Sequence, residues 1–418
     1  MHIYFSGVGG VGVGPLAQIA RDMGYEVSGS DMAESLMTKQ LREQGVSVHI
    51  GQSEAAIAQH HKAKPIDWFV YTAALPADHT ELQFAKKQGI RTSKRDELLA
   101  HMLKEKNLKL IAVAGTHGKT TTTAMFVWLM KQLNVPVSYS IGTTISFGAS
   151  GRFDPKSEYF VYECDEYDNN FLHFWPHASL ITALGYDHPD TFPTVNDYKT
   201  AFRTFLEQSD HTILWEPDEH FLEPIGAHVS YTAFSNDGDF SSFKLAGEHN
   251  RKNAFLVAQL AERLFNTSQQ QAQAVLSRFP GTTRRFEQLA PNLYTDYGHH
   301  PDEVRAMVQL ARELSEHVVV VYQPHQNRRQ HELRHHYTDC MVGAEKVYWL
   351  PTYLSREDEN QPILTPEELI QDLTNKDIVH VANLNEYLWH DIQADLGAGR
   401  LVLCLGAGSI DGWLREHI

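Results

Sequence analysis

Cysteine, long apolar runs and basic charge are all scarce in this 418-residue sequence. Its three cysteines, Cys164, Cys340 and Cys404, make neither a C-x-x-C motif nor an even set for disulfides, so we expect buried free thiols. No apolar run approaches the roughly 18 residues of a membrane-spanning helix. Residues 1–4 lead directly into a strand, without the basic segment that begins a secretion signal. These absences favour a cytoplasmic protein with no membrane segment.

The shortage of basic residues also limits the kinds of partner. The chain has 36 Lys and Arg against 52 Asp and Glu, a formal net charge of -16. Such a balance argues against binding to nucleic acid or to an anionic membrane, although a local pair such as Arg284-Arg285 can still bind an anionic ligand. The sequence has no long proline-rich, glycine-rich or low-complexity stretch, and 42% of its residues are apolar, so we expect an ordered chain.

Strand-like runs alternate with helical periodicity along the chain, which is typical of parallel sheets covered by helices. We therefore predict an α/β fold, and the length suggests about three domains. The first domain is predicted over 1–107, the central domain over 108–289 and the final domain over 290–418. In the central domain we expect strands at 159–162 and 179–184 and a last helix at 253–265; in the final domain we expect strands at 293–296, 318–322 and 401–405.

The most informative motif is a strand, a glycine loop and a helix start over residues 108–127. The loop ends in Gly118-Lys119-Thr120, where loop amides, the lysine charge and the threonine hydroxyl can bind nucleotide phosphates and Mg²⁺. The strict G-x-x-x-x-G-K-[ST] pattern fails, because its first glycine position holds Val113 and the loop glycine is Gly115. A strand and a helix flanking Gly-Lys-Thr are nevertheless uncommon by chance, so we predict ATP binding.

A second glycine loop, near the start of the chain, fits two different functions. Gly7, Gly9 and Gly12 match G-x-G-x-x-G, and Asp31 follows about 20 residues later as a candidate ribose partner. By itself this pattern is typical of a nicotinamide-dependent oxidoreductase, which stays open as an alternative. Beside a separate ATP loop, it indicates instead a domain that holds the diphosphate of a nucleotide-linked substrate.

Acidic residues follow the strand predicted at 159–162, at the edge of the sheet where ligands of α/β proteins bind. Glu163 comes directly after the strand and is the first candidate for Mg²⁺, which usually binds one or two carboxylates together with substrate phosphates. For Asp165, Glu166 and Asp168, a solvated acidic turn is an equal alternative. His188 follows the next predicted strand and could bind a second ion, although a lone histidine is more often structural.

Six motifs then occur in an order that resembles the Mur ligases. They are Gly115–Thr121, Glu163–Glu166, Asp187-His188, Gly247–Asn250, Arg284–Phe286 and Asp296–Pro301. The resemblance covers nearly the whole chain and implies a three-domain architecture, with a Rossmann-like first domain, a central P-loop ATPase-like domain and a Rossmann-like final domain. Within the family, Gly-Thr-His-Gly-Lys-Thr and Tyr-Gly-His-His-Pro are typical of the branch that adds L-alanine and of its murein-peptide relative.

The resemblance implies an ADP-forming ligase of peptidoglycan precursor synthesis. UDP-N-acetylmuramic acid would lie on the first domain, with its diphosphate at Gly9, Gly10 and Gly12 and with Asp31 in the same site. ATP would phosphorylate the carboxylate of this substrate, and the amino group of alanine would attack the acyl phosphate. The implied catalytic residues are Lys119, His188 and Arg285, and the implied Mg²⁺ ligands are Thr120, Glu163 and His188.

The same resemblance implies an ATP site and an amino-acid site. The residues implied at ATP are Gly115, Thr116, His117, Gly118, Lys119, Thr120, Thr121, His249, Asn250, Asn253 and Asp296. Of these, His249, Asn250 and Asn253 would contact adenine and Asp296 the ribose. The amino acid would be held by His325 and Arg329.

Two positions bear on which amino acid is added. After His325 the alanine-adding branch continues with an arginine, Phe, Thr and a second arginine, whereas this chain reads Gln326-Asn327-Arg328-Arg329 and lacks the first arginine. A ligase for another amino acid or for a ready-made peptide therefore stays open. Phe202 stands where the branches that add later residues carry a carbamylated lysine, which favours the alanine-adding branch.

Overall fold

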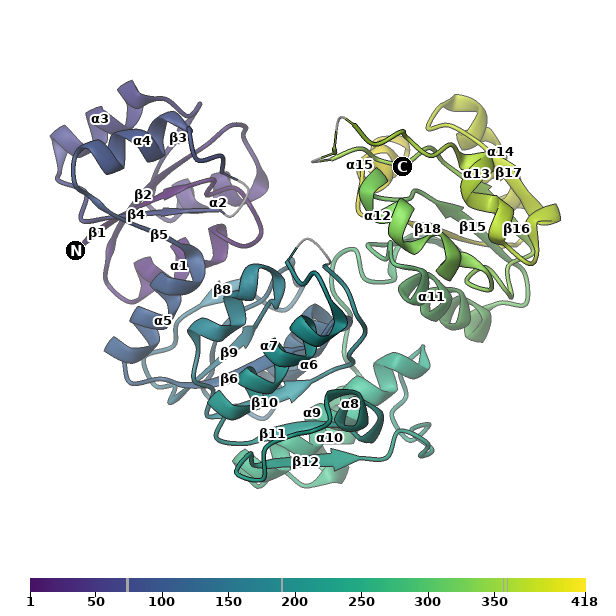
Figure 1. The fold of residues 1–418 in the computed structure, drawn as a ribbon, viewed down its shortest axis with the longest axis horizontal. Helices are drawn as coiled ribbons and strands as arrows, with labels where there is room; N and C mark the ends of the chain where they lie inside the picture. Colours follow the sequence, from purple (N-terminus) through teal and green to yellow (C-terminus); the bar gives the residue numbers. More distant parts are fainter. Residues whose placement is uncertain (73–74, 189–190, 356, 359) are drawn as a thin grey trace. The chain divides into compact units, whose positions relative to one another are not determined.

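The computed structural model describes residues 1–72, 75–188, 191–355, 357–358 and 360–418 (Figure 1). Within these residues the strands form three sheets, and each sheet is mainly or wholly parallel. Close packing divides the chain into two compact units, residues 1–239 with 253–276, and residues 240–252 with 277–418. The first unit contains the first two sheets and the second unit contains the third. The predicted α/β class is thus confirmed, and the domain limits at 107 and 289 stay predictions.

The first sheet is parallel throughout, in the order β3-β2-β1-β4-β5. Its strands are β1 (His2–Ser6), β2 (Glu26–Asp31), β3 (Ser47–Ile50), β4 (Trp68–Tyr71) and β5 (Arg91–Lys94). Its helices are α1 (Gly14–Asp22), α2 (Leu36–Glu43), α3 (Glu54–Ala63), α4 (Thr80–Lys87) and α5 (Arg95–Glu105). Leu16 of α1 and Leu98 of α5 belong to the core on one face, and Ile57 of α3 and Leu82 of α4 to the core on the other (Figure 1). This strand order is Rossmann-like, and it brings the glycine loop after β1 to the middle of the ligand edge.

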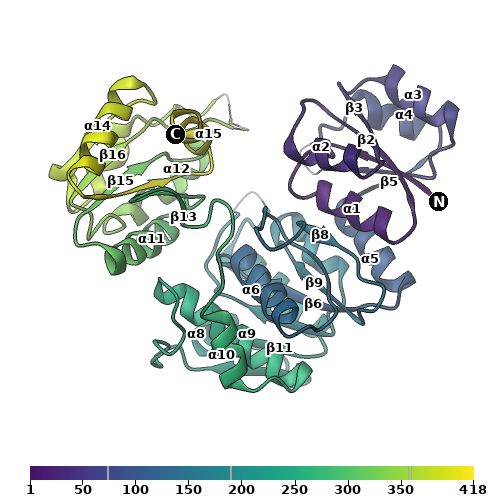
Figure 2. The same cartoon turned by 180° about the vertical axis from the view of Figure 1, so that it is seen from behind.

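The second sheet has the order β12-β11-β10-β6-β9-β7-β8 and is parallel except between β7 and β8. Its strands are β6 (Lys109–Ala114), β7 (Ser138–Ser140), β8 (Gly151–Arg152), β9 (Tyr159–Glu163), β10 (Ala178–Ile181), β11 (Thr212–Trp215) and β12 (Tyr231–Phe234). Its helices are α6 (Lys119–Gln132), the 3-10 helix η1 (Tyr167–His173), α7 (Val195–Gln208), α8 (Glu216–Leu222), α9 (Glu248–Phe265) and α10 (Gln269–Leu276). Figure 2 shows α6, α9 and α10 on the near side of this sheet.

Two predicted elements of this sheet differ in the structure. The helix expected over 253–265 begins earlier, at Glu248, and a further helix, α10, follows it. The strand expected over 179–184 ends at Ile181. Thr182 N still donates to Ala114 O of β6 at 3.0 Å, and the chain turns to the ATP loop only at Ala183. Thr182 Oγ1 donates to His117 O, and Thr116 N donates to Ala183 O at 2.8 Å.

The third sheet, in the second unit, has the order β13-β14-β18-β15-β16-β17 and is parallel except between β13 and β14. Its strands are β13 (Glu287–Ala290), β14 (Leu293–Asp296), β15 (Val318–Tyr322), β16 (Lys346–Trp349), β17 (Val379–Val381) and β18 (Leu401–Leu405). Its helices are α11 (Pro301–Leu314), α12 (Asn327–Leu333), η2 (Arg334–Tyr337), α13 (Pro366–Leu369), η3 (Ile370–Asp372), η4 (Lys376–Ile378), α14 (Glu386–Gly397) and α15 (Ile410–His417). Val304 and Val308 of α11 pack on one face, and Leu388 of α14 and Leu414 of α15 on the other.

Local sequence accounts for many of these boundaries. Ser35 and Ser53 accept hydrogen bonds from the first turns of α2 and α3, as N-cap residues do. The strand runs predicted at 293–296, 318–322 and 401–405 are strands with the same bounds. Their side chains are almost entirely buried, as expected of strands covered by helices on both faces.

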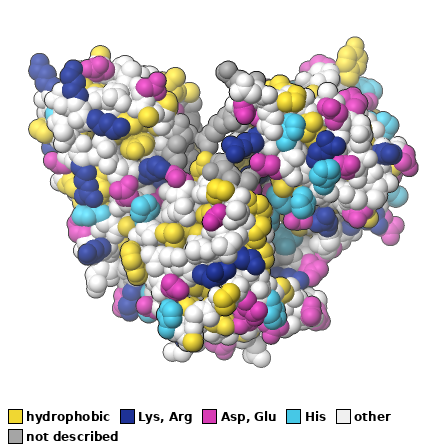
Figure 3. Space-filling view, in the orientation of Figure 1, with side chains coloured by type: hydrophobic (Ala, Val, Ile, Leu, Met, Phe, Trp, Pro, Cys, Tyr) yellow, Lys and Arg dark blue, Asp and Glu magenta, His cyan; other side chains and the backbone are white. Residues whose placement is uncertain are grey.

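None of the helices in the described part of the chain is long and apolar enough to cross a membrane. On the face of the molecule drawn in Figure 3, basic and acidic side chains are interspersed. The three cysteines are buried free thiols, as predicted.

Candidate active site and nucleotide-binding loops

The ATP loop connects β6 to α6 and is shaped by two glycines. Gly115 has φ +126°, and a Cβ there would lie 2.5 Å from Thr182 Oγ1 and 2.8 Å from the carbonyl of Ala183. Gly118 has φ +84°, and a Cβ there would lie 2.9 Å from Asn253 Nδ2. Since only glycine adopts these conformations at little cost, the loop can fold tightly against the edge of the sheet. The predicted phosphate-binding residues 115–121 all lie on this loop or in the first turn of α6.

Lys119, the first residue of α6, binds back to the loop and to a buried carboxylate. Its Nζ donates to the carbonyl of Gly115 at 2.7 Å and to Glu166 Oε2 at 2.8 Å. Glu166 is completely buried, so the solvated-turn alternative is wrong for this residue. Burial alone would lower the pKa of Lys119, but the nearby carboxylates, Glu166 above all, raise it, so the lysine is charged.

Thr120 and Glu163, two of the predicted Mg²⁺ ligands, lie together. Thr120 Oγ1 donates to Glu163 Oε1 at 2.8 Å, and the amide of Gly142 donates to Glu163 Oε2 at 3.2 Å. A hydroxyl and a carboxylate at the first turn of α6 are the hard oxygen donors that suit Mg²⁺ beside a nucleotide phosphate. The described residues therefore fit the predicted ion at this point.

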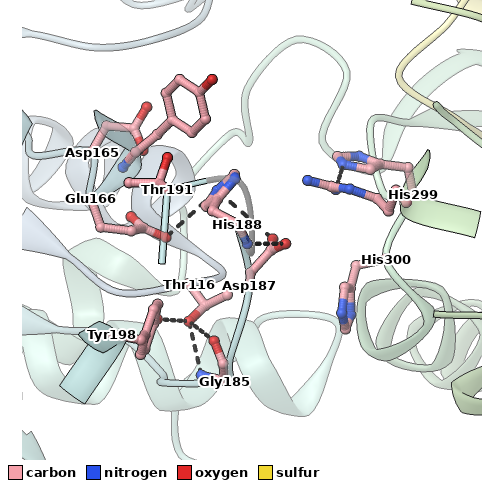
Figure 4. Close-up of polar contacts among 12 residues, drawn as sticks. Thr116, Asp165, Glu166, Gly185, Asp187, His188, Thr191, Tyr198, His299 and His300 are labelled. Carbon is pink, nitrogen blue, oxygen red and sulfur yellow. Dashed lines mark hydrogen bonds and ion pairs between the residues drawn. The ribbon is translucent and has the colours of Figure 1, made fainter. Parts of the chain in front are cut away.

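His188, the third predicted ligand, lies beside a group of acidic residues (Figure 4). Its Nε2 lies 4.0 Å from Glu166 Oε1 and 3.8 Å from Asp187 Oδ2. One ligand atom from each of Asp165, Glu166 and His188 falls within a span of 4.8 Å, which is close enough to share an ion. Glu166 Oε1 is buried without a hydrogen-bond partner among the described residues, so this group fits a cation. Asp168 instead pairs with Lys94.

Tyr198 of α7 supports the ATP loop, and the sequence analysis did not identify it. Its hydroxyl lies 2.5 Å from Thr116 Oγ1 (Figure 4). The same threonine oxygen donates to the carbonyl of Gly185 at 2.8 Å and accepts from its amide at 2.8 Å. Tyr198 is fully buried among aromatic rings. A buried tyrosine in a helix gives no sequence signal of such a partner.

The first glycine loop, between β1 and α1, carries the residues predicted for the UDP-linked substrate. The amide of Gly9 donates to Asp31 Oδ2 at 2.7 Å, which brings the predicted ribose partner to the loop. A cavity of about 150 Å³ adjoins the loop and is lined in part by Gly9, Pro15, Ser35 and Thr143. A Cβ on Gly12 would lie 2.1 Å from Arg95 Nη1. Arg95 was not among the predicted residues.

A buried carboxylate, Glu81 of α4, lies behind the first loop and was also missed. It is completely buried and accepts hydrogen bonds from three hydroxyls. These are Tyr4 at 2.9 Å, Ser6 at 2.7 Å and Ser30 at 2.7 Å. Ser6 immediately precedes the loop, and the carbonyl of Ser30 accepts from the amide of Gly7 at 2.9 Å. Glu81 thus ties α4 to both strands that hold the loop.

The residues predicted at adenine start α9. Asn250 Nδ2 donates to the carbonyl of Ala246 at 2.9 Å, and burial lowers the pKa of His249 to about 4, so this imidazole is neutral at pH 7. Both residues belong to the second compact unit, where Arg251 makes two hydrogen bonds of 2.8 Å to Glu313. Asn253 belongs to the first unit, where its side chain lies against Gly118.

Asp296, predicted at the ribose, ends β14 in the second unit. Its two oxygens accept from the amides of Phe286 at 2.7 Å and Gly298 at 2.6 Å. Burial raises the pKa of Asp296 to about 6, although the positive charge of Arg285 acts to lower it. Arg284 donates to the carbonyl of Gly406 at 3.1 Å and so serves the fold, which is consistent with Arg285 as the catalytic candidate of the pair.

The residues predicted for the amino acid, His325 and Arg329, lie together in the second unit with His299. Arg329 Nη1 contacts His299 Nε2, and the rings of His299 and His325 are 5.3 Å apart. Tyr353 stacks on His325 with ring centres 5.8 Å apart. The resemblance implied His325 and Arg329 at the amino acid. It did not imply His299 or Tyr353, which come from other loops. Gln326, the departure from the family pattern, adopts φ +63°.

Comparison with known proteins gives matches along nearly the whole chain. Family models match residues 2–107 (Mur ligase family, catalytic domain), 113–238 (Mur ligase middle domain) and 284–408 (Mur ligase, glutamate ligase domain). The UDP-N-acetylmuramate–L-alanine ligase of Carboxydothermus hydrogenoformans is 31% identical over 98% of this chain and 95% of its own. That of Lachnospira eligens is 32% identical over 98% of this chain and 96% of its own.

Two solved structures extend these matches to the fold. The UDP-N-acetylmuramate–alanine ligase of Thermotoga maritima has a TM-score of 0.77 at 23% identity, covering 100% of this chain and 98% of that chain. A murein peptide ligase of Psychrobacter arcticus has a TM-score of 0.68 at 21% identity, with the same coverage. At these identities the structural likeness shows a shared fold.

Proposed function

The chain belongs to the Mur ligase family, and on that premise we propose that it joins L-alanine to UDP-N-acetylmuramic acid, with conversion of ATP to ADP and phosphate. The observation that carries this proposal is the match over 98% of the chain to ligases of that name. The reaction would be a step of peptidoglycan precursor synthesis, in the cytoplasm. Membership of a ligase family counts against the nicotinamide-dependent alternative, and the first glycine loop then serves the UDP-linked substrate.

The chemistry starts from a carboxylate, which is a poor electrophile. Transfer of the γ-phosphoryl group of ATP to a carboxylate oxygen releases ADP and gives an acyl phosphate. The amino group of alanine then attacks the acyl carbon and loses a proton, and the tetrahedral intermediate expels phosphate as the amide forms. Each step builds negative charge, so fixed positive charge is the main contribution that the protein can make.

The residues of the ATP loop supply that charge in this proposal. Lys119 Nζ would exchange Glu166 and the loop carbonyls for the β- and γ-phosphates. Arg285 would bring a second positive charge to the transferring group. Thr120 and Glu163 would hold a Mg²⁺ ion, with His188 at a second one, and such ions neutralise phosphate charge when bound. The buried oxygen of Glu166 and its position near His188 support the second site.

The Mg²⁺ assignment has its own test. Glu163→Gln keeps the shape of the side chain and removes its charge, so the Mg²⁺ concentration for half-maximal turnover should rise by about tenfold or more. Glu158→Gln, at a largely exposed glutamate directly before β9, is the matched control. An unchanged Mg²⁺ titration for Glu163→Gln would remove this residue from the ion.

Specificity for the amino acid is the second question, because Gln326 replaces the first arginine of the family pattern. A ligase for another amino acid or for a peptide is the competing function. Phosphate release from MgATP should be measured with UDP-N-acetylmuramic acid and L-alanine, glycine, L-serine or an L-alanyl tripeptide, each with a control lacking the sugar nucleotide. Sugar-dependent release that is fastest with L-alanine is expected. A faster rate with another acceptor would replace alanine in the proposal, and no release with any acceptor would contradict the ligase function.

A further inference from the structure

Arg95 lies against the first glycine loop although the two are more than 80 positions apart in the sequence. It is the first residue of α5 and directly follows β5. The carboxyl end of β5 lies on the same edge of the parallel sheet as the loop after β1. Because a Cβ on Gly12 would lie 2.1 Å from Arg95 Nη1, the guanidinium occupies the space that any other residue at position 12 would need.

The surroundings of the loop are otherwise acidic. Asp31 accepts from the amide of Gly9, and the carboxylate of Glu81 is buried behind the loop. Three other basic residues of this domain are paired with carboxylates. Arg21 pairs with Asp22, Arg42 with Glu34 and Lys94 with Asp168. A diphosphate on this loop would therefore meet two negative groups unless a cation offsets them.

Arg95 is held so that its terminal nitrogens can serve a ligand. Its Nε donates to Asp96 Oδ2 at 3.2 Å, and Asp96 is only 2% exposed. The other oxygen of Asp96 accepts from the hydroxyl of Tyr162 at 2.6 Å, which fixes the carboxylate. The ion pair of Arg95 with Asp96 is made through Nε, at one side of the guanidinium. Arginine keeps its charge at any ordinary pH and can bind two oxygens of a phosphate at once.

We propose that Arg95 binds the diphosphate of the UDP-linked substrate, and that Asp96 is the positioning residue that aims it. The proposal rests on the proposed function for the identity of the ligand. It also gives position 12 a second reason to be glycine, because a side chain there would push the guanidinium off the loop. The cavity beside the loop, lined by Gly9 and Ser35 among others, leaves room for the ligand next to this cation.

The first test is calorimetric binding of UDP-N-acetylmuramic acid, UDP and uridine to the full-length protein. Arg95→Ala should weaken binding of both diphosphates by about 30-fold, the loss expected for charge-assisted hydrogen bonds, and leave uridine unchanged. The UDP affinity of Arg95→Lys should lie between those of Arg95→Ala and the unsubstituted protein, because lysine keeps the charge but cannot bind two phosphate oxygens in the paired geometry of arginine. Arg21→Ala removes a cation of the same domain and should change nothing, and ADP binding should be unchanged in every variant.

The second test uses Gly12→Ala in a double-mutant cycle with Arg95→Ala. Gly12→Ala should weaken UDP binding in the unsubstituted protein and have little further effect in Arg95→Ala, because both changes remove the same contact. Asp96→Asn should weaken UDP binding while uridine affinity is unaffected, a pattern that loss of folding would not produce.

Several outcomes would overturn the inference. They are UDP binding by Arg95→Ala at the original affinity, an equal loss for uridine and UDP, and additive effects of Gly12→Ala and Arg95→Ala. If the unsubstituted protein binds UDP but releases no phosphate with any acceptor, the proposed function fails while the assignment of Arg95 stands. Absence of UDP binding by the unsubstituted protein would overturn both.

Discussion

The two glycine loops of the first unit are built alike but are stabilised differently. Each follows a central strand of a parallel sheet, leads into a helix and has a completely buried glutamate beside it. Glu81, at the first loop, accepts from three hydroxyls. Glu166, at the ATP loop, accepts from the ammonium group of Lys119 and has a second oxygen without a hydrogen-bond partner among the described residues.

The carboxylate of Glu81 therefore has fixed hydrogen-bond partners, whereas the partner of Glu166, Lys119, can move to a ligand. No substrate competes for the hydroxyls at Glu81, since they belong to the core. A phosphate bound by Lys119 would compete with Glu166 for the same nitrogen. We therefore expect substitution of Glu81 to act mainly through the fold, and substitution of Lys119 to act on turnover as well as on the fold.

The largest effect should come from Lys119→Ala. Loss of one preorganised charge at a transferring phosphoryl group typically lowers turnover by about 10²- to 10³-fold. Steady-state phosphate release measures this, and UDP binding at the first loop should be unaffected. Full activity would remove Lys119 from the mechanism, and loss of UDP binding would show that the two loops are not independent.

The same substitution should also lower the free energy of unfolding, by about 3 kcal/mol, because it leaves the buried carboxylate of Glu166 without its cation. Adding Glu166→Gln should recover most of that loss in urea unfolding, since no buried charge then remains. Lys64→Ala, at an exposed pair with Glu26, is the control and should change stability by less than about 1 kcal/mol. A double variant no more stable than Lys119→Ala would contradict this account of the pair.

At the first loop, Glu81→Ala should lower the free energy of unfolding by about 2 kcal/mol, because three buried hydroxyls lose their acceptor. Glu81→Gln should lower the free energy of unfolding by less, since the amide oxygen can still accept hydrogen bonds from the hydroxyls. Turnover at saturating substrate should change little in both variants, in contrast to Lys119→Ala. Glu43→Ala, at an exposed position on α2, is the matched control. If Glu81→Ala instead lowered turnover with stability unchanged, the distinction between the loops would fail.

The smallest effect is expected for Tyr198→Phe, which keeps the buried ring and removes only the hydroxyl that meets Thr116. One neutral hydrogen bond contributes about 1 kcal/mol, so ATP affinity should fall by about fivefold. Tyr231→Phe removes a hydroxyl bound to Glu219, away from the loop, and should leave ATP affinity unchanged. Equal ATP binding by Tyr198→Phe and the unsubstituted protein would limit Tyr198 to packing.

The contrast between the loops also explains what the sequence could predict. The ATP loop carries its cation and hydroxyl within three consecutive residues, 118–120, so its function is readable from a short segment. Glu163 could be predicted from the sequence for a similar reason, because it directly follows a recognisable strand. The α/β class and the central strands of the second and third sheets, which are β6, β9 and β10 and β14, β15 and β18, followed from apolar runs in the same way.

The remaining groups depend on contacts between distant segments. Arg95 and Gly12 are 83 positions apart, Tyr4 and Glu81 are 77 apart, and Thr116 and Tyr198 are 82 apart. Nothing local distinguishes Arg95 from other arginines or Glu81 from an ordinary surface glutamate of a helix. The same holds for Glu166, whose burial depends on how the segment after β9 folds back toward Lys119.

The buried thiols make it possible to follow the unfolding of the two units separately. Cys164 lies in the first unit, and Cys340 and Cys404 lie in the second, all with no exposed surface. A thiol reagent added in a short pulse will modify each cysteine only when its surroundings open, and peptide mass analysis can tell the sites apart. The unmodified chain thus carries a native reporter in each unit, and a cysteine placed on the surface would be the most accessible point for a label.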